Sequence, residues 1–323
     1  YYASRAAGGA ANELVVMDLD KYASASSAYD EAVRQKVSIV VGPLSKEALA
    51  DLATRLERPV PILALNRIDQ VLPAAGSALV QLSLSPEDEA AGIAELAFGA
   101  GARRALIISP AGDWGSKMDT ALRQRWTDLG GAIASSATYS TYDDYSSSVK
   151  SALSLDASEQ RAGELHTLLD TTIEFTPRRR QDPDVVFLLS RSGAEARSIK
   201  PLLAFHYAGN LPVYALPGIY SGIPDERNQD LNGIHLVQIP WLLGASPDLR
   251  ATLATGDADS GNYTQFNALG ADAFLVQSNF MRLQSGADVL FRANTGLLIM
   301  DPNLRIQREL SAATFDGGAL QAQ

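Results

Sequence analysis

The stretch that decides the fold is residues 105–131, ALIISPAGDWGSKMDTALRQRWTDLGG. It begins with four apolar residues, 105–108, which predict a strand buried on both faces of a sheet. Apolar side chains at helical spacing follow and end at two glycines, which predicts a helix: Met118, Leu122, Trp126 and Leu129, then Gly130-Gly131. A buried strand followed by an amphipathic helix is the repeating unit of a parallel sheet covered by helices.

The same alternation runs along most of the chain. Further buried strands are predicted at 14–17, 38–41, 61–65 and 185–189. Helices are predicted after the capping residues Ser45 and Ser85, and over the apolar stripe from Leu269 to Leu283. Residues 296–308 predict a β-hairpin on the turn Asp301-Pro302-Asn303. This order predicts an α/β fold of two doubly wound units.

Length and charge restrict the function. The chain has 323 residues, of which 46% are hydrophobic, and its formal net charge is −10. Such a charge repels phosphate backbones and anionic membrane surfaces, so no nucleic-acid partner is expected. The chain contains no Cys, which excludes disulfides and thiolate metal sites and is weak support for an exported protein. No apolar run is long enough to span a bilayer.

Catalytic and metal-binding motifs are missing from the sequence. The three histidines, His166, His206 and His235, have no partner at metal-ligand spacing. Residues 99–104 resemble a dinucleotide loop but run from a helix into a strand, and 257–262 resemble a calcium loop without its glutamate. We therefore predict no catalytic residue, no metal and no cofactor, and the chain is not expected to be an enzyme.

The sequence does offer candidate binding residues. In doubly wound sheets, ligands collect at the carboxyl ends of the strands. Polar or aromatic residues at such positions, or in the turn-rich stretch 218–233, are the candidates for a ligand cleft: Ser45, Asn66, Arg67, Asp113, Trp114, Ser190 and Tyr220. Ser45 suits an anion because it lies at a helix start, although a plain helix cap explains it as well.

The basic run Arg178-Arg179-Arg180 ends a polar excursion that begins at Tyr139. Arginine pairs bidentately with carboxylates and is favoured at interfaces, so the three residues are candidates for contact with a partner. Asp182 and Asp184 lie close by, and a role in holding this segment internally is slightly favoured.

A resemblance to a known family rests mainly on the middle of the chain. Residues 175–187, FTPRRRQDPDVVF, together with motifs in the same order and spacing further on, are similar to the LppC/LpoA family of bacterial lipoproteins: Tyr207 to Ala215, Ile219 to Gly222, Asp230 to Gly233 and Ile239-Pro240-Trp241. Looser matches at 42–44, 64–66, 268–273 and 308–310 extend the resemblance over nearly all of the chain.

The resemblance implies a type I periplasmic-binding-protein-like fold, in which two α/β lobes are joined by three crossovers. It also implies a non-enzymatic periplasmic regulator that activates a class A penicillin-binding protein in peptidoglycan synthesis. Members are tethered to the outer membrane by an N-terminal lipid. Compared with them, this sequence is expected to be a fragment that comprises the carboxy-terminal domain, without the lipid-bearing cysteine and the amino-terminal helical-repeat domain. Compared with the family, the chain begins near the end of the first helix, so we expect the first strand of lobe one to be missing.

Three crossovers are expected near 83–86, 233–237 and 286–288. Lobe one would then comprise 1–82 and 236–285, and lobe two 83–235 and 286–323. The alternative function is a solute-binding protein of an amino-acid-type ABC transporter, which would hold a small ligand in the cleft. That alternative requires a clamp for a carboxylate and an ammonium group. Asn66-Arg67 stands where such binders usually have small hydroxyl residues, and this disfavours the solute-binding alternative.

Overall fold

The chain forms two compact α/β units. A computed structural model describes residues 1, 4, 8, 13–68, 79–169, 174–253, 264–284 and 290–323. Unit 1 comprises Tyr1–Ser85 and Ile239–Leu310, and unit 2 comprises Pro86–Gln238 and Ser311–Gln323. The chain therefore passes between the units three times, after Ser85, after Gln238 and after Leu310.

Unit 1 contains a sheet with the strand order β1-β2-β3-β11-β10-β9. Neighbouring strands from β1 to β11 pair in parallel, and β10 and β9 continue the sheet in antiparallel fashion. The bounds are β1 (Val40–Val41), β2 (Ile62–Ala64), β3 (Leu79–Leu82), β9 (Leu290–Arg292), β10 (Leu297–Met300) and β11 (Arg305–Glu309).

Helices cover both faces of this sheet. Ile62 and Ala64 of β2 pack with α2 and α3, whereas Leu63 between them packs with α10. The alternation follows from the geometry of a strand, whose successive side chains point to opposite faces. The helices of unit 1 are α2 (Ala25–Arg34), α3 (Lys46–Ala53), α9 (Pro247–Leu253), α10 (Thr264–Ser278) and α11 (Phe280–Gln284).

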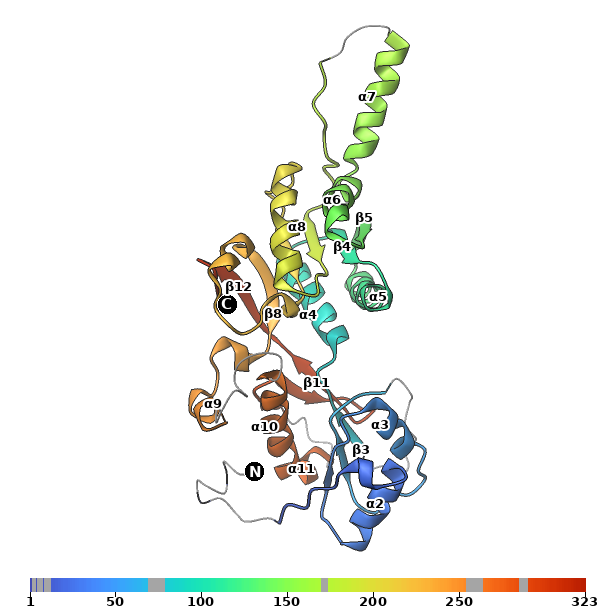
Figure 1. The fold of residues 1–323 in the computed structure, drawn as a ribbon, viewed down its shortest axis with the longest axis vertical. Coiled ribbons are helices and arrows are strands. Elements are labelled where there is room, and N and C mark those ends of the chain that lie inside the picture. Colours follow the sequence, from blue (N-terminus) through green and yellow to red (C-terminus); the bar gives the residue numbers. More distant parts are fainter. Residues whose placement is uncertain are drawn as a thin grey trace. The chain divides into compact units, whose positions relative to one another are not determined.

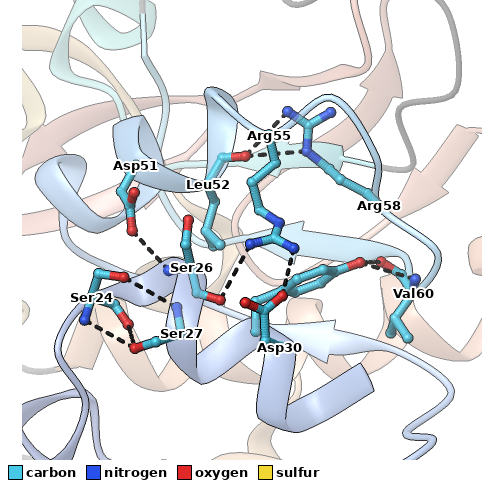
Figure 2. A network of polar contacts seen from close by, with 10 residues as sticks. Ser24, Ser26, Ser27, Asp30, Asp51, Leu52, Arg55, Arg58 and Val60 are labelled. Atoms are coloured by element: carbon cyan, nitrogen blue, oxygen red, sulfur yellow. Dashed lines mark hydrogen bonds and ion pairs between the residues drawn. The ribbon is translucent and has the colours of Figure 1, made fainter. Parts of the chain in front are cut away.

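Polar contacts join α2 to α3 (Figure 2). The Asp51 carboxylate accepts a hydrogen bond of 2.7 Å from the Ser26 amide, and Arg55 forms an ion pair of 2.6 Å with Asp30. The buried Arg58 guanidinium donates to the last carbonyl groups of α3, those of Leu52 and Ala53. Helix ends leave such carbonyls without intrahelical partners, so Arg58 caps α3 in the interior.

Unit 2 contains a sheet with the strand order β13-β12-β8-β7-β6-β4-β5. Strands β4 to β8 pair in parallel, and β12 and β13 are antiparallel. The bounds are β4 (Arg104–Pro110), β5 (Ala132–Tyr139), β6 (Val185–Leu188), β7 (Val213–Ala215), β8 (Ile234–Gln238), β12 (Ser311–Asp316) and β13 (Ala319–Ala322).

This second sheet is also covered on both faces. Leu106 and Ile108 of β4 belong to a core that includes Ile199 of α8 and Val149 of α6. On the other face the Phe187 ring meets the buried Trp126 of α5 edge-on, at 5.1 Å between ring centroids. The helices are α4 (Pro86–Gly99), α5 (Asp113–Asp128), α6 (Tyr145–Ala152), α7 (Leu155–Leu169) and α8 (Gly193–Phe205), and all five are labelled in Figure 1.

Short 3₁₀ helices complete the two units. They occupy Leu19–Lys21, Tyr142–Asp144, Pro217–Ile219, Glu226–Leu231 and Pro240–Leu243. The second of them joins β5 to α6, and the third begins the turn-rich stretch predicted from the sequence.

Most of the predicted elements are confirmed. The strand predicted at 105–108 is β4, and those at 38–41, 61–65 and 185–189 are β1, β2 and β6, each somewhat shorter than predicted. The hairpin predicted on 301–303 is β10 and β11, paired from Leu297↔Glu309 to Met300↔Ile306. The strand predicted at 14–17 is wrong: these residues are not in a strand, and Val16 is 80% exposed.

The division of the chain differs from the prediction at the third crossover. The expected position, 286–288, lies outside the described residues, but 290–310 belong to unit 1, not to the second lobe as expected. The reason is the hairpin, because β11 returns beside β3 with Arg305 opposite Gln81. The chain leaves unit 1 only after that strand. The first two passages lie at 85/86 and 238/239, against expected positions of 83–86 and 233–237.

Candidate functional site

Three of the predicted cleft residues lie in unit 1, at the carboxyl ends of β1 and β2. Ser45 caps α3, with its Oγ accepting from the Ala48 amide at 3.1 Å. Asn66 Nδ2 donates to the carbonyl of Leu44 at 2.6 Å, which holds the loops after β1 and β2 together. Ser45 and Asn66 are therefore neighbours, as strand-end residues of adjacent parallel strands should be.

Arg67 is bonded to residues of its own unit. Its Nη2 donates to Ser85 Oγ at 2.6 Å, and its own amide is held by Asn66 Oδ1 at 2.8 Å. Ser85 is buried and is the last residue of unit 1 before the chain enters unit 2. The Arg67 side chain thus supports the segment that leads to the crossover.

The other four cleft candidates lie in unit 2. Ser190, which follows β6, is fully buried, with its Oγ 3.4 Å from the hydroxyl of Tyr139 at the end of β5. Tyr139 donates at 3.0 Å to Glu195 Oε2, which also accepts from the Arg191 amide at 2.8 Å. Burial raises the pKa of the Tyr139 hydroxyl well above its usual range. Tyr139 therefore stays protonated and serves as a donor to the carboxylate.

Trp114 lies at the start of α5, next to the exposed Asp113. The Arg191 guanidinium is 5.0 Å from the centre of a Trp114 ring, a cation–π contact that joins the loop after β6 to the start of α5. Tyr220 packs edge-on against Phe315 at 5.8 Å. The structure thus brings Trp114 close to the loop that contains Ser190.

Tyr139 and Glu195 complete this cluster but were not predicted as site residues, whereas Arg191 directly follows the predicted Ser190 at the end of β6. Glu195 had a sequence signal, since Ser192 precedes it by three positions, which is the spacing of a helix cap. Tyr145 and Tyr142 extend the cluster with aromatic contacts of 5.0 and 5.4 Å. Ser190 and Tyr139 are buried, so the groups of this cluster that can meet a polar ligand or a protein surface are the exposed Arg191 and Tyr142.

The three arginines 178–180 have different surroundings: two are bonded within unit 2 and one is exposed. Arg179 is buried and donates to the Tyr207 carbonyl at 2.7 Å and to Asn210 Oδ1 at 3.1 Å. Arg180 makes two bonds of 2.7 Å to Asp182, whose carboxylate is also bound by Arg104 at 2.6 Å. Arg178 is exposed, so it alone of the three offers its side chain to a partner.

The pH dependence of unit 2 tests the role of Asp182. Hydrogen bonds from Arg180 and then from Arg104 hold the pKa of the Asp182 carboxyl well below its usual range. The ion pairs therefore stabilise the fold above the unfolded pKa near 4, and this contribution is lost as the pH falls further. We measure the free energy of unfolding in urea at pH 5 and at pH 2. Between these two values the wild type is expected to lose about 1 kcal/mol more of it than Asp182→Asn, a small difference because solvent screens this partly exposed carboxylate. If the free energies of unfolding of the wild type and of Asp182→Asn fell equally with pH, this role would be contradicted.

The described residues show no metal or membrane-spanning feature. Within 13–68, 79–169, 174–253, 264–284 and 290–323, no three His, Asp or Glu side chains gather as metal ligands would. No helix in that part of the chain is long and apolar enough to cross a membrane. His206 contacts Ser146 and His235 stacks on Tyr214, and burial lowers the pKa of each imidazole.

Comparison with known proteins places the chain in a family. The family model described as "LppC putative lipoprotein" matches residues 2–318, which include both units. The chain belongs to the LppC family. A curated relative from Vibrio antiquarius, "Penicillin-binding protein activator LpoA", is 29% identical over 95% of this chain and 51% of its own length. This LppC chain thus spans about half the length of the curated relatives it matches.

Solved structures agree with this assignment at the level of the fold. The LpoA (YraM) C-domain from Haemophilus influenzae, described as a regulator of PBP1A, covers 95% of the LppC chain and 88% of its own, with a TM-score of 0.74 and 22% identity. A putative branched-chain amino acid ABC transporter protein from Rhodospirillum rubrum covers 100% and 91%, with a TM-score of 0.67 and 17% identity. The LppC chain therefore has a type I periplasmic-binding-protein-like fold.

Proposed function

We propose that this chain is the part of a penicillin-binding protein activator that presents binding surfaces to a class A penicillin-binding protein. The observation that carries the proposal is the LppC match over both units, together with a relative named as such an activator along 95% of this chain. We further propose that it acts in the periplasm as part of a lipoprotein tethered to the outer membrane.

The proposed role is regulatory, without catalysis by this chain. The polar groups at the strand ends are engaged in holding loops together: Ser45 caps a helix, Asn66 holds the neighbouring loop, and Tyr139 is bound to Glu195. Such an arrangement favours rigid surfaces over reacting groups. A regulator needs only that its binding to the enzyme depends on the enzyme's conformation.

The alternative is a solute-binding protein for an amino-acid transporter. Its support is the shared fold with the Rhodospirillum rubrum protein, and at 17% identity that likeness extends to the fold alone. Binding an amino acid would require groups in unit 1 that are free to clamp a carboxylate. Asn66 and Arg67 instead bond to Leu44 and Ser85 of their own unit.

A binding assay with two arms tests the proposal. The purified chain is titrated against a purified class A penicillin-binding protein from the bacterium that encodes it, and separately against leucine and the other amino acids by calorimetry. We expect saturable binding to the enzyme, with faster transpeptidation of lipid-linked precursor, and no heat with any amino acid. Tight binding of an amino acid that Ser45→Ala abolishes, without binding to the enzyme, would establish the transporter alternative.

A further inference from the structure

The helix α7 is buried only at its beginning. Leu155 and Ser158 are its buried residues, and from 159 to 169 every residue except the half-buried Ala162 is exposed. Figure 1 shows α7 following α6, with its far end clear of the other elements of unit 2. Isolated helices shorter than about 12 to 15 residues are marginal in water, and tertiary packing normally supplies the missing stability. The second half of α7 has no such packing within the described residues.

Three leucines lie on one face of this exposed half. Leu165, Leu168 and Leu169 are spaced by three and four residues, so successive turns of the helix place them side by side. They are 50%, 78% and 57% exposed. Together they present roughly 300 Å² of apolar surface, a patch size that often marks an interaction site on a monomer. We call these three residues the leucine face and treat it as a candidate docking surface.

An exposed cation lies beside the buried start of α7. The amide of Arg178 donates to Ser158 Oγ at 3.3 Å, so the chain that returns to the sheet passes this point of the helix. The Arg178 side chain is exposed. Ser158 precedes Leu165 by seven residues, which is about 10 Å along the helix axis. An occupant of the leucine face that extends two helical turns toward the sheet would therefore also meet Arg178.

A second copy of this chain and a membrane surface are poor occupants of the leucine face. Stable association of two copies needs about 800 Å² on each partner, more than twice what the face offers. Each copy also has a net charge of −10, which opposes self-association. Helices that lie on membranes have lysine and arginine on their polar face, whereas 159–169 contains two glutamates and one arginine. These features favour a groove on a protein partner.

We propose that the leucine face of α7 inserts into an apolar groove of the class A penicillin-binding protein, with Arg178 facing a carboxylate at one end of that groove. The inference rests on the proposed function and specifies the surface through which it acts. Apolar anchors at i, i+3 and i+4 are the pattern that a groove recognises on an amphipathic helix. Arginine pairs well with a carboxylate at such a rim. A small contact suits a regulator, because it forms and breaks with the state of the enzyme.

Substitution of two of the leucines tests this surface. The double variant Leu165→Gln, Leu168→Gln keeps the helix propensity, and exposed substitutions of this kind change stability little. We expect it to bind the enzyme about tenfold more weakly or worse, because the apolar area buried in the groove is lost. The matched control is Leu56→Gln in unit 1, a leucine that is 89% exposed, which should bind like the wild type. Equal affinities of the wild type and a double variant that is folded by circular dichroism would overturn the α7 proposal alone.

Hydrogen exchange of the unaltered chain gives a second measurement, which needs no substitution. Peptides that cover 159–169 should exchange several-fold more slowly when the enzyme is bound. An unchanged exchange rate in these peptides would overturn the proposal. Slowing that appears only at high concentration of the chain alone, or only with vesicles of phosphatidylethanolamine and phosphatidylglycerol, would assign the face to a second copy or to a membrane instead. If the wild type itself binds no class A enzyme, the proposed function fails and the α7 proposal fails with it.

Arg178→Gln tests the carboxylate at the end of the groove. Charges at the rim of an interface act mainly on the rate of association, and salt screens them. We expect the variant to associate about threefold more slowly than the wild type at low salt, with the difference lost in 0.5 M NaCl. Equal rates at low salt would overturn this part of the proposal.

Discussion

Replacing Asp272 by alanine is expected to lower the free energy of unfolding of unit 1 by about 4 kcal/mol. The Asp272 carboxylate is fully buried in α10. It accepts four hydrogen bonds of 2.6 to 2.8 Å, two from Asn294 and two from Thr295. Removing it leaves two backbone amides and two side-chain donors without a partner in the interior. Each buried donor without an acceptor costs free energy.

Urea denaturation monitored by hydrogen exchange with mass spectrometry measures this loss for each unit separately. Peptides of unit 1 should exchange at lower urea in Asp272→Ala, and peptides of unit 2 should be unchanged. Asp272→Asn is the control, because its amide keeps one acceptor oxygen and should lose about half as much. Equal transition midpoints for the wild type and Asp272→Ala would show that the turn at 294–295 does not depend on this carboxylate.

The predictable part of the fold is the part that local sequence determines. The strand and helix of 105–131 were confirmed because one segment contains both the buried run and the helix that covers it. Ser45 was confirmed as a helix cap because its contact lies only three residues away. The hairpin at 301–303 follows likewise from a turn and two adjacent strands.

The errors arise where the answer depends on distant segments. Residues 14–17 have the same apolar pattern as 105–108, yet Leu14, Val15 and Val16 are exposed. Such a run is buried only if neighbouring strands and helices cover it, which the run itself does not encode. The third crossover was misplaced for a similar reason, because the pairing of Arg305 with Gln81 joins segments that are far apart in sequence.

In the candidate site, too, the residues that were missed depend on segments far apart in the sequence. Ser190 and Trp114 were predicted from their positions after strands, but Tyr139 was not. The sheet order β6-β4-β5 is what brings the end of β5 near the loop after β6, and strand order cannot be deduced from the run of elements alone. The Tyr139 bond to Glu195 could therefore be found only from the structure.

Gly115→Ala is expected to destabilise unit 2 by about 3 kcal/mol or more. Gly115 lies in the first turn of α5, where a Cβ atom would be 1.7 Å from the Pro110 carbonyl oxygen. That oxygen belongs to the backbone at the end of β4, so it cannot rotate away. Either the strand or the helix must shift, and a shift of α5 would also displace Trp114 from the Arg191 guanidinium that packs on it.

The matched control for this change is Gly163→Ala in α7, where a Cβ atom would meet nothing within 4 Å. There alanine should stabilise the helix by about 0.5 to 1 kcal/mol, because glycine is a poor helix former. Thermal unfolding of the two variants should thus shift in opposite directions from the wild type. If Gly115→Ala melts like the wild type, β4 and α5 do not require the close approach, and the cluster around Trp114 does not depend on it. The opposite shifts would show that the same substitution is governed by space at one site and by helix propensity at the other.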